Sequence, residues 1–165
     1  MQVLFLAAEY LQLEALKKLK MNQDKIARRL IKKKLVPLLE KDGFIGVFPN
    51  YRRFGDKALH LLAFEFNKYG GSFFLELACV PRGDLEMSWG EVVLEQDLTV
   101  AHTNFESRAR LQQNGRANSL SDDWFQYQNL SEPEIEKLVS GVGDLLSQVN
   151  DWFVDGAVGK NISVT

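Results

Sequence analysis

Two glutamates and the arginines around them are the residues of this chain whose types and spacing could support chemistry. Glu65 and Glu76 fall in two segments of alternating polarity, 58–66 and 73–80, on the side that we expect to face away from the core. A carboxylate whose pKa is raised by a neighbouring carboxylate can act as a general base. The candidate binding face consists of Tyr51, Arg52, Arg53, Glu65, Phe74, Glu76, Arg108, Arg110 and Trp124.

Two interpretations of this face stay open. Arginines and glutamates on a sheet can form a solvated ladder of ion pairs, or they can line a groove for a ligand or a partner. Arg108 and Arg110 are two positions apart, so in a strand both side chains point to the same face. We expect that face to be the one that holds Glu65 and Glu76, with carboxylate–guanidinium pairs between the strands.

Residue types for other kinds of catalysis are sparse. The two histidines, His60 and His102, are far apart and have no acidic residues at metal-ligand spacing, which indicates structural or surface roles. We expect Cys79, the only cysteine, to lie on the core side of its strand, where a thiol stays protonated and inert. Gly141-Val142-Gly143 resembles a piece of a phosphate loop, but its helical context favours close packing or a helix break. The sequence therefore predicts no catalytic residue, no metal and no cofactor.

The chain has the size and composition of one folded domain. Its 165 residues are 45% hydrophobic and 25% charged, and a chain of this length can bury a core without disulfides. A single cysteine cannot form an intramolecular disulfide, which favours a reducing compartment. The apolar start at residues 1–8 lacks the basic region and cleavage pattern of a signal peptide, and no apolar run is long enough to cross a bilayer. We therefore expect a cytoplasmic protein without a membrane partner.

Charge is distributed unevenly along the chain. Residues 17–41 carry ten Lys or Arg against two acidic residues, a local charge of +8, whereas residues 83–165 carry five against fourteen, a local charge of −9. Regions of opposite charge either cover each other or face different partners. The basic helix face around Arg28, Arg29 and Lys32 could contact phosphates, but no aromatic residue interleaves it. We therefore expect a solvated face there, and nucleic acid is not the expected partner.

The N-terminal part of the chain is predicted to be helical. Apolar residues at helical spacing predict one helix over 1–20 and a second over 23–41, with Asn22 as the N-cap of the second. Pro37 removes a backbone donor, which predicts a kink just before it. We interpret the first 20 residues as an extension outside the domain, consistent with a gene-start artefact in which Met21 is the true initiator.

The middle of the chain changes to a period of two, which is typical of strands. Segments 58–66 and 73–80 form a predicted hairpin, and the glycines of the connector 67–71 can supply positive φ. A register in which paired positions add to 139 or 141 places the apolar sets of both strands on the core side. Further, less regular strands are expected at 87–96, 99–112 and 124–127.

Helical signals return towards the C-terminus. Ser131-Glu132-Pro133-Glu134 is a capping box with proline in the first turn, and it predicts a helix that runs to about residue 153. The tail at 155–165 is expected to be loose. These elements predict an α+β fold, an antiparallel meander with N-terminal and C-terminal helices packed on one face, in a single domain at 21–154.

Several landmarks occur in the order and spacing of one protein family. They are Leu35-Val36-Pro37-Leu38-Leu39 followed by Gly43-Phe44, Tyr51-Arg52-Arg53, the segment 67–74, Arg108-Ala109-Arg110-Leu111 and Asp122-Asp123-Trp124-Phe125. Over residues 21–153 the chain resembles the bacterial domain of unknown function 4304 family. It departs from that pattern at Phe66, where similar proteins tend to have glutamine, and at 103–106, where they tend to have a Cys-His pair.

The resemblance implies a compact bacterial cytoplasmic domain without established enzymatic chemistry. Some relatives look like members of toxin and immunity neighbourhoods, which points to partner binding. With the acidic C-terminal half, this favours a non-enzymatic, immunity-like protein that binds a basic surface of another protein. The alternative is a small-molecule-binding or enzymatic site at Glu65 and Glu76, in which one carboxylate acts as general base. A third hypothesis is weak contact between the basic helix and nucleic acid.

Overall fold

The computed structural model describes residues 2–115 and 123–164, with side chains from residue 6 onward. Its helices are α1 (Gln2–Lys34), α2 (Val36–Lys41), α3 (Glu132–Asp144) and α4 (Leu146–Asp155). Its strands are β1 (Ile45–Val47), β2 (Asn50–Phe54), β3 (Ala58–Phe66), β4 (Ser72–Pro81), β5 (Leu85–Glu86), β6 (Val92–Val93), β7 (Arg108–Leu111), β8 (Phe125–Gln126) and β9 (Ile162–Val164). Short 3-10 helices are η1 (Glu95–Asp97), η2 (Val100–His102) and η3 (Phe105–Ser107).

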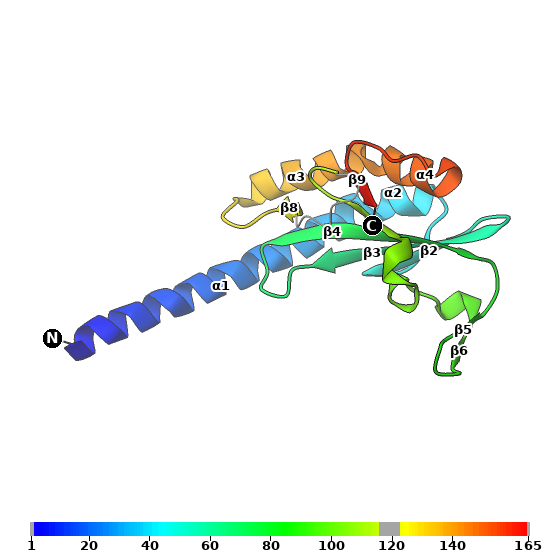
Figure 1. Ribbon diagram of the computed structural model, residues 1–165. Coiled ribbons are helices and arrows are strands. Elements are labelled where there is room, and N and C mark those ends of the chain that lie inside the picture. Colours follow the sequence, from blue (N-terminus) through cyan, green and yellow to red (C-terminus); the bar gives the residue numbers. More distant parts are fainter. Residues whose placement is uncertain (1, 116–122, 165) are drawn as a thin grey trace.

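An antiparallel sheet organises the fold. Its strands lie in the order β1-β2-β3-β4-β7-β9, β8 pairs with β4, and β5 and β6 form a separate small hairpin. Helices α1 to α4 pack on one face of the sheet, which we call the helix face, and the segment from β5 to η3 lies on the other, the outer face (Figure 1). The predicted α+β arrangement is confirmed. Of the helices in the described part of the chain, none is both long and apolar enough to span a bilayer.

The β3–β4 hairpin positions the main core. Its paired residues add to 139, as in Leu62 with Leu77, so the predicted register is confirmed. Gly70 and Gly71 have φ angles of 79° and 88°, which suits the turn between the strands. The side chains on the helix face of the hairpin pack with α1 to α4, and buried members of this core include Ile31, Leu62, Phe64, Leu75, Leu77 and Val139.

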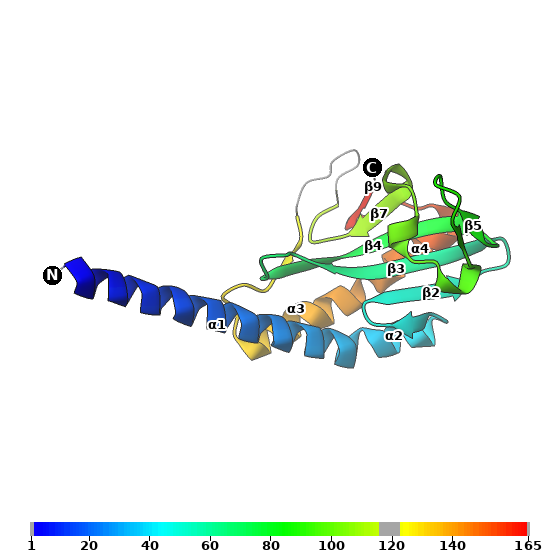
Figure 2. The same cartoon turned by 90° about the horizontal axis from the view of Figure 1, so that it is seen from below.

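Helix α1 is one continuous helix and not two. The predicted N-cap at Asn22 is wrong because residues 2–34 contain no glycine or proline that would interrupt a helix. The two halves of α1 pack differently, since Ala27 and Ile31 are buried and the first half runs beyond the sheet (Figure 2). Large apolar residues of this first half are exposed: Leu6, Tyr10, Leu11, Leu13, Leu16, Leu19 and Met21.

The helix breaks near Pro37 as predicted. Helix α1 ends at Lys34 and α2 begins at Val36. Gly143 of α3 lies close to this break, since a Cβ at Gly143 would come within 3.1 Å of Leu38 Cδ1. Close packing of helices therefore accounts for this glycine, in agreement with the interpretation preferred over a phosphate loop.

The regions of opposite charge cover each other in part. Arg29 Nη2 lies 2.5 Å from Glu132 Oε1, and Lys34 Nζ lies 2.8 Å from Glu136 Oε1, so α1 and α3 are linked by two ion pairs. These four side chains are 30% to 54% exposed, and ion pairs at such sites contribute little stability each. Glu132 and Glu136, which belong to the acidic half predicted to bind a basic partner, are therefore already paired within the domain.

The C-terminal region differs from its prediction in two ways. The capping box is present, because Ser131 Oγ donates to Glu134 Oε2 over 2.6 Å, but the helix is divided at Leu145 into α3 and α4. The tail is not loose, because β9 pairs with β7 and Ile162 is buried in the main core. A strand of three residues is too short to show a recognisable alternation in the sequence. It is ordered because it pairs with a neighbouring strand.

Candidate functional site

The strand register divides the candidate residues between the two faces of the sheet. The outer face holds Arg52, Glu65, Phe74, Glu76, Arg108 and Arg110, and Trp124 contacts Phe74 there, with ring centroids 4.7 Å apart. Tyr51 and Arg53 lie on the helix face, so the prediction of one shared face is wrong for these two. Consecutive residues of a strand point to opposite faces, and residues 51–53 therefore cannot share one.

On the helix face, Arg53 and His60 tie β2 and β3 to α4. Arg53 Nε donates to His60 Nδ1 over 3.1 Å, and Arg53 Nη1 donates to Asn150 Oδ1 over 2.9 Å. The His60 ring stacks on Phe153, with centroids 4.6 Å apart. Burial, and then the Arg53 charge, lower the pKa of His60, so the ring is neutral and can accept the Arg53 hydrogen bond. The interpretation of His60 as structural is confirmed.

Tyr51 and Cys79 show how far the helix face is covered. Tyr51 lies in the main core, and burial raises the pKa of its phenol. Cys79 points to the same face, opposite His60, but it is exposed, so the prediction of a buried thiol is wrong. Alternation predicts which face a residue is on, but not how far the covering helices reach. Partial desolvation still raises the pKa of the Cys79 thiol, which keeps it protonated.

The outer face is not a solvated surface but holds a second apolar core. Leu98 and Val100 pack onto it, although strands rather than 3-10 helices were expected in this region. In η2, His102 Nδ1 accepts a hydrogen bond from the backbone N–H of Thr99 over 3.0 Å, which confirms a structural role for this histidine. The expectation of a regular strand over 99–107 is wrong, because tight turns let apolar residues point down onto the sheet. At most 1% is exposed for each member of the outer core: Leu59, Leu61, Ala63, Ala78, Leu98 and Val100.

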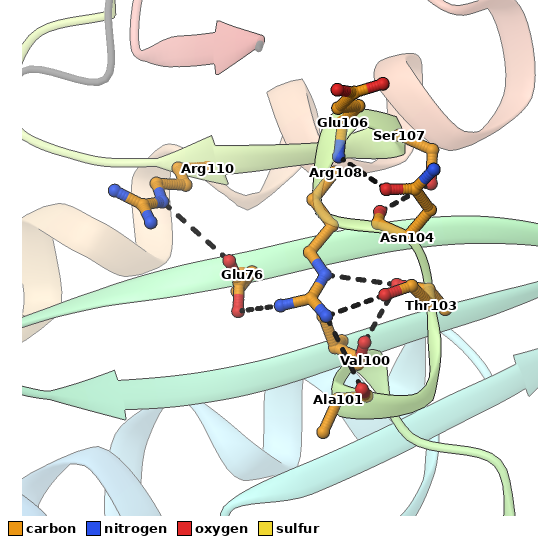
Figure 3. A network of polar contacts seen from close by, with 9 residues as sticks. All are labelled: Glu76, Val100, Ala101, Thr103, Asn104, Glu106, Ser107, Arg108 and Arg110. Atoms are coloured by element: carbon orange, nitrogen blue, oxygen red, sulfur yellow. Dashed lines mark hydrogen bonds and ion pairs between the residues drawn. The ribbon is translucent and has the colours of Figure 1, made fainter. Parts of the chain in front are cut away.

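A polar network closes the edge of this second core. Arg108 Nη1 donates to Glu76 Oε2 over 3.3 Å, and Arg110 Nε lies 3.8 Å from Glu76 Oε1, so the predicted pairing with Glu76 is confirmed. Arg108 also reaches the covering segment, where Nη2 donates to the Thr103 carbonyl over 2.7 Å and Nε donates to Thr103 Oγ1 over 3.2 Å (Figure 3). Arg108 therefore links Glu76 to the segment 99–107, and Arg110 pairs with Glu76 from the other side. Glu76 is thus engaged and poorly placed for catalysis.

Glu65 differs from Glu76 in its surroundings. It is exposed, and the described part of the chain offers it no ion-pair partner within 4 Å. Partial desolvation, together with the negative charge of Glu76, raises the pKa of Glu65 despite the opposing effect of Arg108 and Arg110. The expected pairing between the arginines and the glutamates thus holds for Glu76 and not for Glu65.

Arg52 lies beside exposed apolar residues that the sequence analysis did not single out. Ile45 is opposite Arg52 across β1 and β2, Val47 follows two positions on, and Phe54 is two positions from Arg52. Ile45 is 57% exposed, Val47 83% and Phe54 41%. We call these four residues the β1 patch. The alternation in Ile45-Gly46-Val47 is the only sequence signal for it, and three residues are too few to indicate a strand.

A mainly apolar groove lies elsewhere on the molecule. It has a volume of about 590 Å³ and lies against α3, between Phe125, Leu138, Val142 and Asn161. None of the candidate residues lines it. Its walls are mainly apolar, and they carry none of the arginine–glutamate pairs that the sequence analysis singled out.

Metal ligands and known relatives give no further indication of function. Within residues 2–115 and 123–164, no group of three or more His, Cys, Asp or Glu side chains is placed to hold a metal ion. In comparisons with family models, curated proteins and solved structures, nothing matches the chain. The resemblance to the domain of unknown function 4304 family therefore stays an expectation from the residues quoted above.

Proposed function

We propose that this domain is a non-enzymatic protein-binding module that binds its partner through the β1 patch. The observation that carries this proposal is the exposure of Ile45, Val47 and Phe54 on one face of two paired strands. Apolar side chains that gather on a surface are typical of interaction sites, whereas scattered single ones are not. The second core lies directly beside them, so the patch continues an apolar surface that the segment 93–102 covers only in part.

The state of the polar groups also supports binding over catalysis. Glu76 is held between two arginines, and His60 and His102 both accept structural hydrogen bonds. A catalytic base needs a free lone pair within reach of a substrate. Glu65 and Cys79 both combine exposure with a raised pKa. The raised pKa keeps the Cys79 thiol protonated and unreactive, so Glu65 remains the one of the two that could act as a base.

An immunity-like role is the narrower form of this proposal. It is supported by the family resemblance, which implies partner binding. The original charge argument is weaker than expected, because Glu132 and Glu136 of the acidic half already pair with α1. We therefore place the partner on the β1 patch and not on the acidic helices.

The proposal is tested by removing the apolar character of the patch. Copurification from a bacterial lysate, followed by reconstitution with the purified candidate partner, should give a complex with the wild type and not with the Ile45→Ser, Val47→Ser double variant. The matched control is Val154→Ser with Val158→Ser, which alters exposed valines outside the patch. Binding that survives in the Ile45→Ser, Val47→Ser variant would place the interface elsewhere.

A second candidate function is a small-molecule or enzymatic site at Glu65. The raised pKa of this exposed carboxylate, beside the Phe74–Trp124 pair, favours it. A screen of small molecules by thermal shift, repeated on Glu65→Gln, tests it. A ligand that stabilises the wild type and not the variant would move this candidate ahead of protein binding.

A further inference from the structure

We propose that the partner segment that binds the β1 patch carries a carboxylate, which pairs with Arg52 between the flanking apolar side chains. This inference rests on the proposed protein-binding function and names the chemistry of the partner. It assigns Arg52 the role of determining specificity, while Ile45, Val47 and Phe54 supply the apolar contact.

Arg52 stands apart from the other arginines that the structure describes. Arg28 lies over the Phe66 ring, and Arg29 pairs with Glu132. Arg53 contacts His60 and Asn150, Arg82 pairs with Glu95, and Arg108 and Arg110 both reach Glu76. For Arg52, residues 2–115 and 123–164 provide no hydrogen bond, ion pair or aromatic contact, and its Nε is buried without an acceptor.

The buried Nε–H has no acceptor and lies out of reach of a partner, whereas the two terminal nitrogens of Arg52 are not buried and can donate to a group on the surface. The guanidinium is a planar fork that matches a carboxylate with two parallel hydrogen bonds. The sheet itself cannot supply the carboxylate, because the residues paired with Arg52 on either side are Ile45 and Leu61. An acidic side chain from a partner would therefore complete an interaction that this face of the sheet leaves open.

The surroundings of Arg52 select the class of partner. Nucleic acid is recognised by several free cations that neutralise successive phosphates. The Arg82 guanidinium that lies over the Phe54 ring is already paired with Glu95. The β1 patch itself contains one cation, Arg52, among three apolar side chains. An apolar peptide segment with one Asp or Glu matches this composition. β1 is also at the edge of the sheet, so an extended segment can approach it without displacing a strand.

The inference can be tested with a random peptide display library selected on four proteins. They are the wild type, Arg52→Met, the Ile45→Ser with Val47→Ser variant, and Lys57→Met as a control that removes an exposed cation from the neighbouring β2–β3 turn. The wild type and the Lys57 control should enrich apolar peptides that contain Asp or Glu. For a synthetic peptide of the enriched sequence, replacement of the acid by its amide should weaken binding to the wild type by about tenfold.

The outcomes separate the inference from the proposed function. Arg52→Met should bind the acid and amide peptides equally, and a thermal melt establishes that this variant is folded. If Arg52→Met keeps the preference for the acid while the serine variant loses all binding, the carboxylate pairing is wrong and the patch remains the interface. If the serine variant binds as the wild type does, or if the wild type enriches no peptide, both proposals are wrong.

Discussion

The helix face of the sheet is covered by α1 to α4, whose apolar residues recur at helical spacing, whereas the outer face is covered by 3-10 turns that place Leu98 and Val100 on the strands. Large side chains interlock over most of the helix face, up to the end of β4, where Cys79 is exposed. On the outer face, the smaller apolar cover is held in place by Arg108 and Glu76. An irregular segment can therefore cover a sheet when a polar network fixes its position. Because such a segment contains few apolar residues, the sheet beyond them stays exposed.

The largest expected effect comes from the helix face. Phe64→Ala should destabilise the fold by about 3–5 kcal/mol, because Phe64 is buried among α1 and the sheet, whereas Leu98→Ala on the outer face should cost about 2 kcal/mol. The smaller loss is expected because the short turns around Leu98 can move into the gap. Urea unfolding of both variants gives the two values, and equal losses would show that the outer cover is as rigid as the helices.

The polar network is expected to be the weak point of the outer face. Arg108→Ala should destabilise by about 1–3 kcal/mol, because it leaves Glu76, whose side chain is 8% exposed, without its 3.3 Å partner. The double variant Arg108→Met with Glu76→Gln should recover part of this loss. Arg82→Ala, which breaks an ion pair on the surface, is the control and should have a smaller effect. Additive changes in the unfolding free energy would mean that Arg108 and Glu76 do not interact.

The pH dependence of stability should report on the helix face. The pKa of His60 is lowered in the folded state, so the unfolded chain binds a proton more readily. The stability that neutral His60 provides is present above the unfolded pKa of about 6.5 and is lost as the pH falls below it, with a slope of at most about 1.4 kcal/mol per pH unit for one proton. Unfolding of the wild type and of His60→Gln from pH 7.5 to pH 5 measures this difference. A constant difference over that range would contradict the lowered pKa.

The smallest effect is expected from the exposed first half of α1, which covers neither face. Removal of residues 1–20 should leave the melting temperature unchanged within about 5 °C, since the leucines from Leu6 to Leu19 are exposed. The variant should also retain the helical signal of residues 23–34. A larger drop would show that the first half of α1 supports the domain despite its exposure.

Local signals in the sequence determined a large part of this fold. Alternation in 58–66 and 73–80 is enough to predict the β3–β4 hairpin and its register, because a shift by one residue would turn every apolar side chain to the wrong face. The capping box at Ser131 and the break near Pro37 are local as well, since each depends on residues within one turn. The pairing of Arg108 and Arg110 with Glu76 followed from the same alternation.

Tertiary structure alone decided the features that depend on distant segments. The exposure of Cys79 and the order of β9 depend on which segments pack beside these residues, and local patterns do not contain that information. The outer face is covered because residues 95–107 fold back over the sheet. The sequence does not predict this fold-back, since 3-10 turns have no regular apolar period. Arg52 is the clearest case. Within the described residues it has no partner because its neighbours across the strands are Ile45 and Leu61, and the residues beside it in the chain do not reveal this.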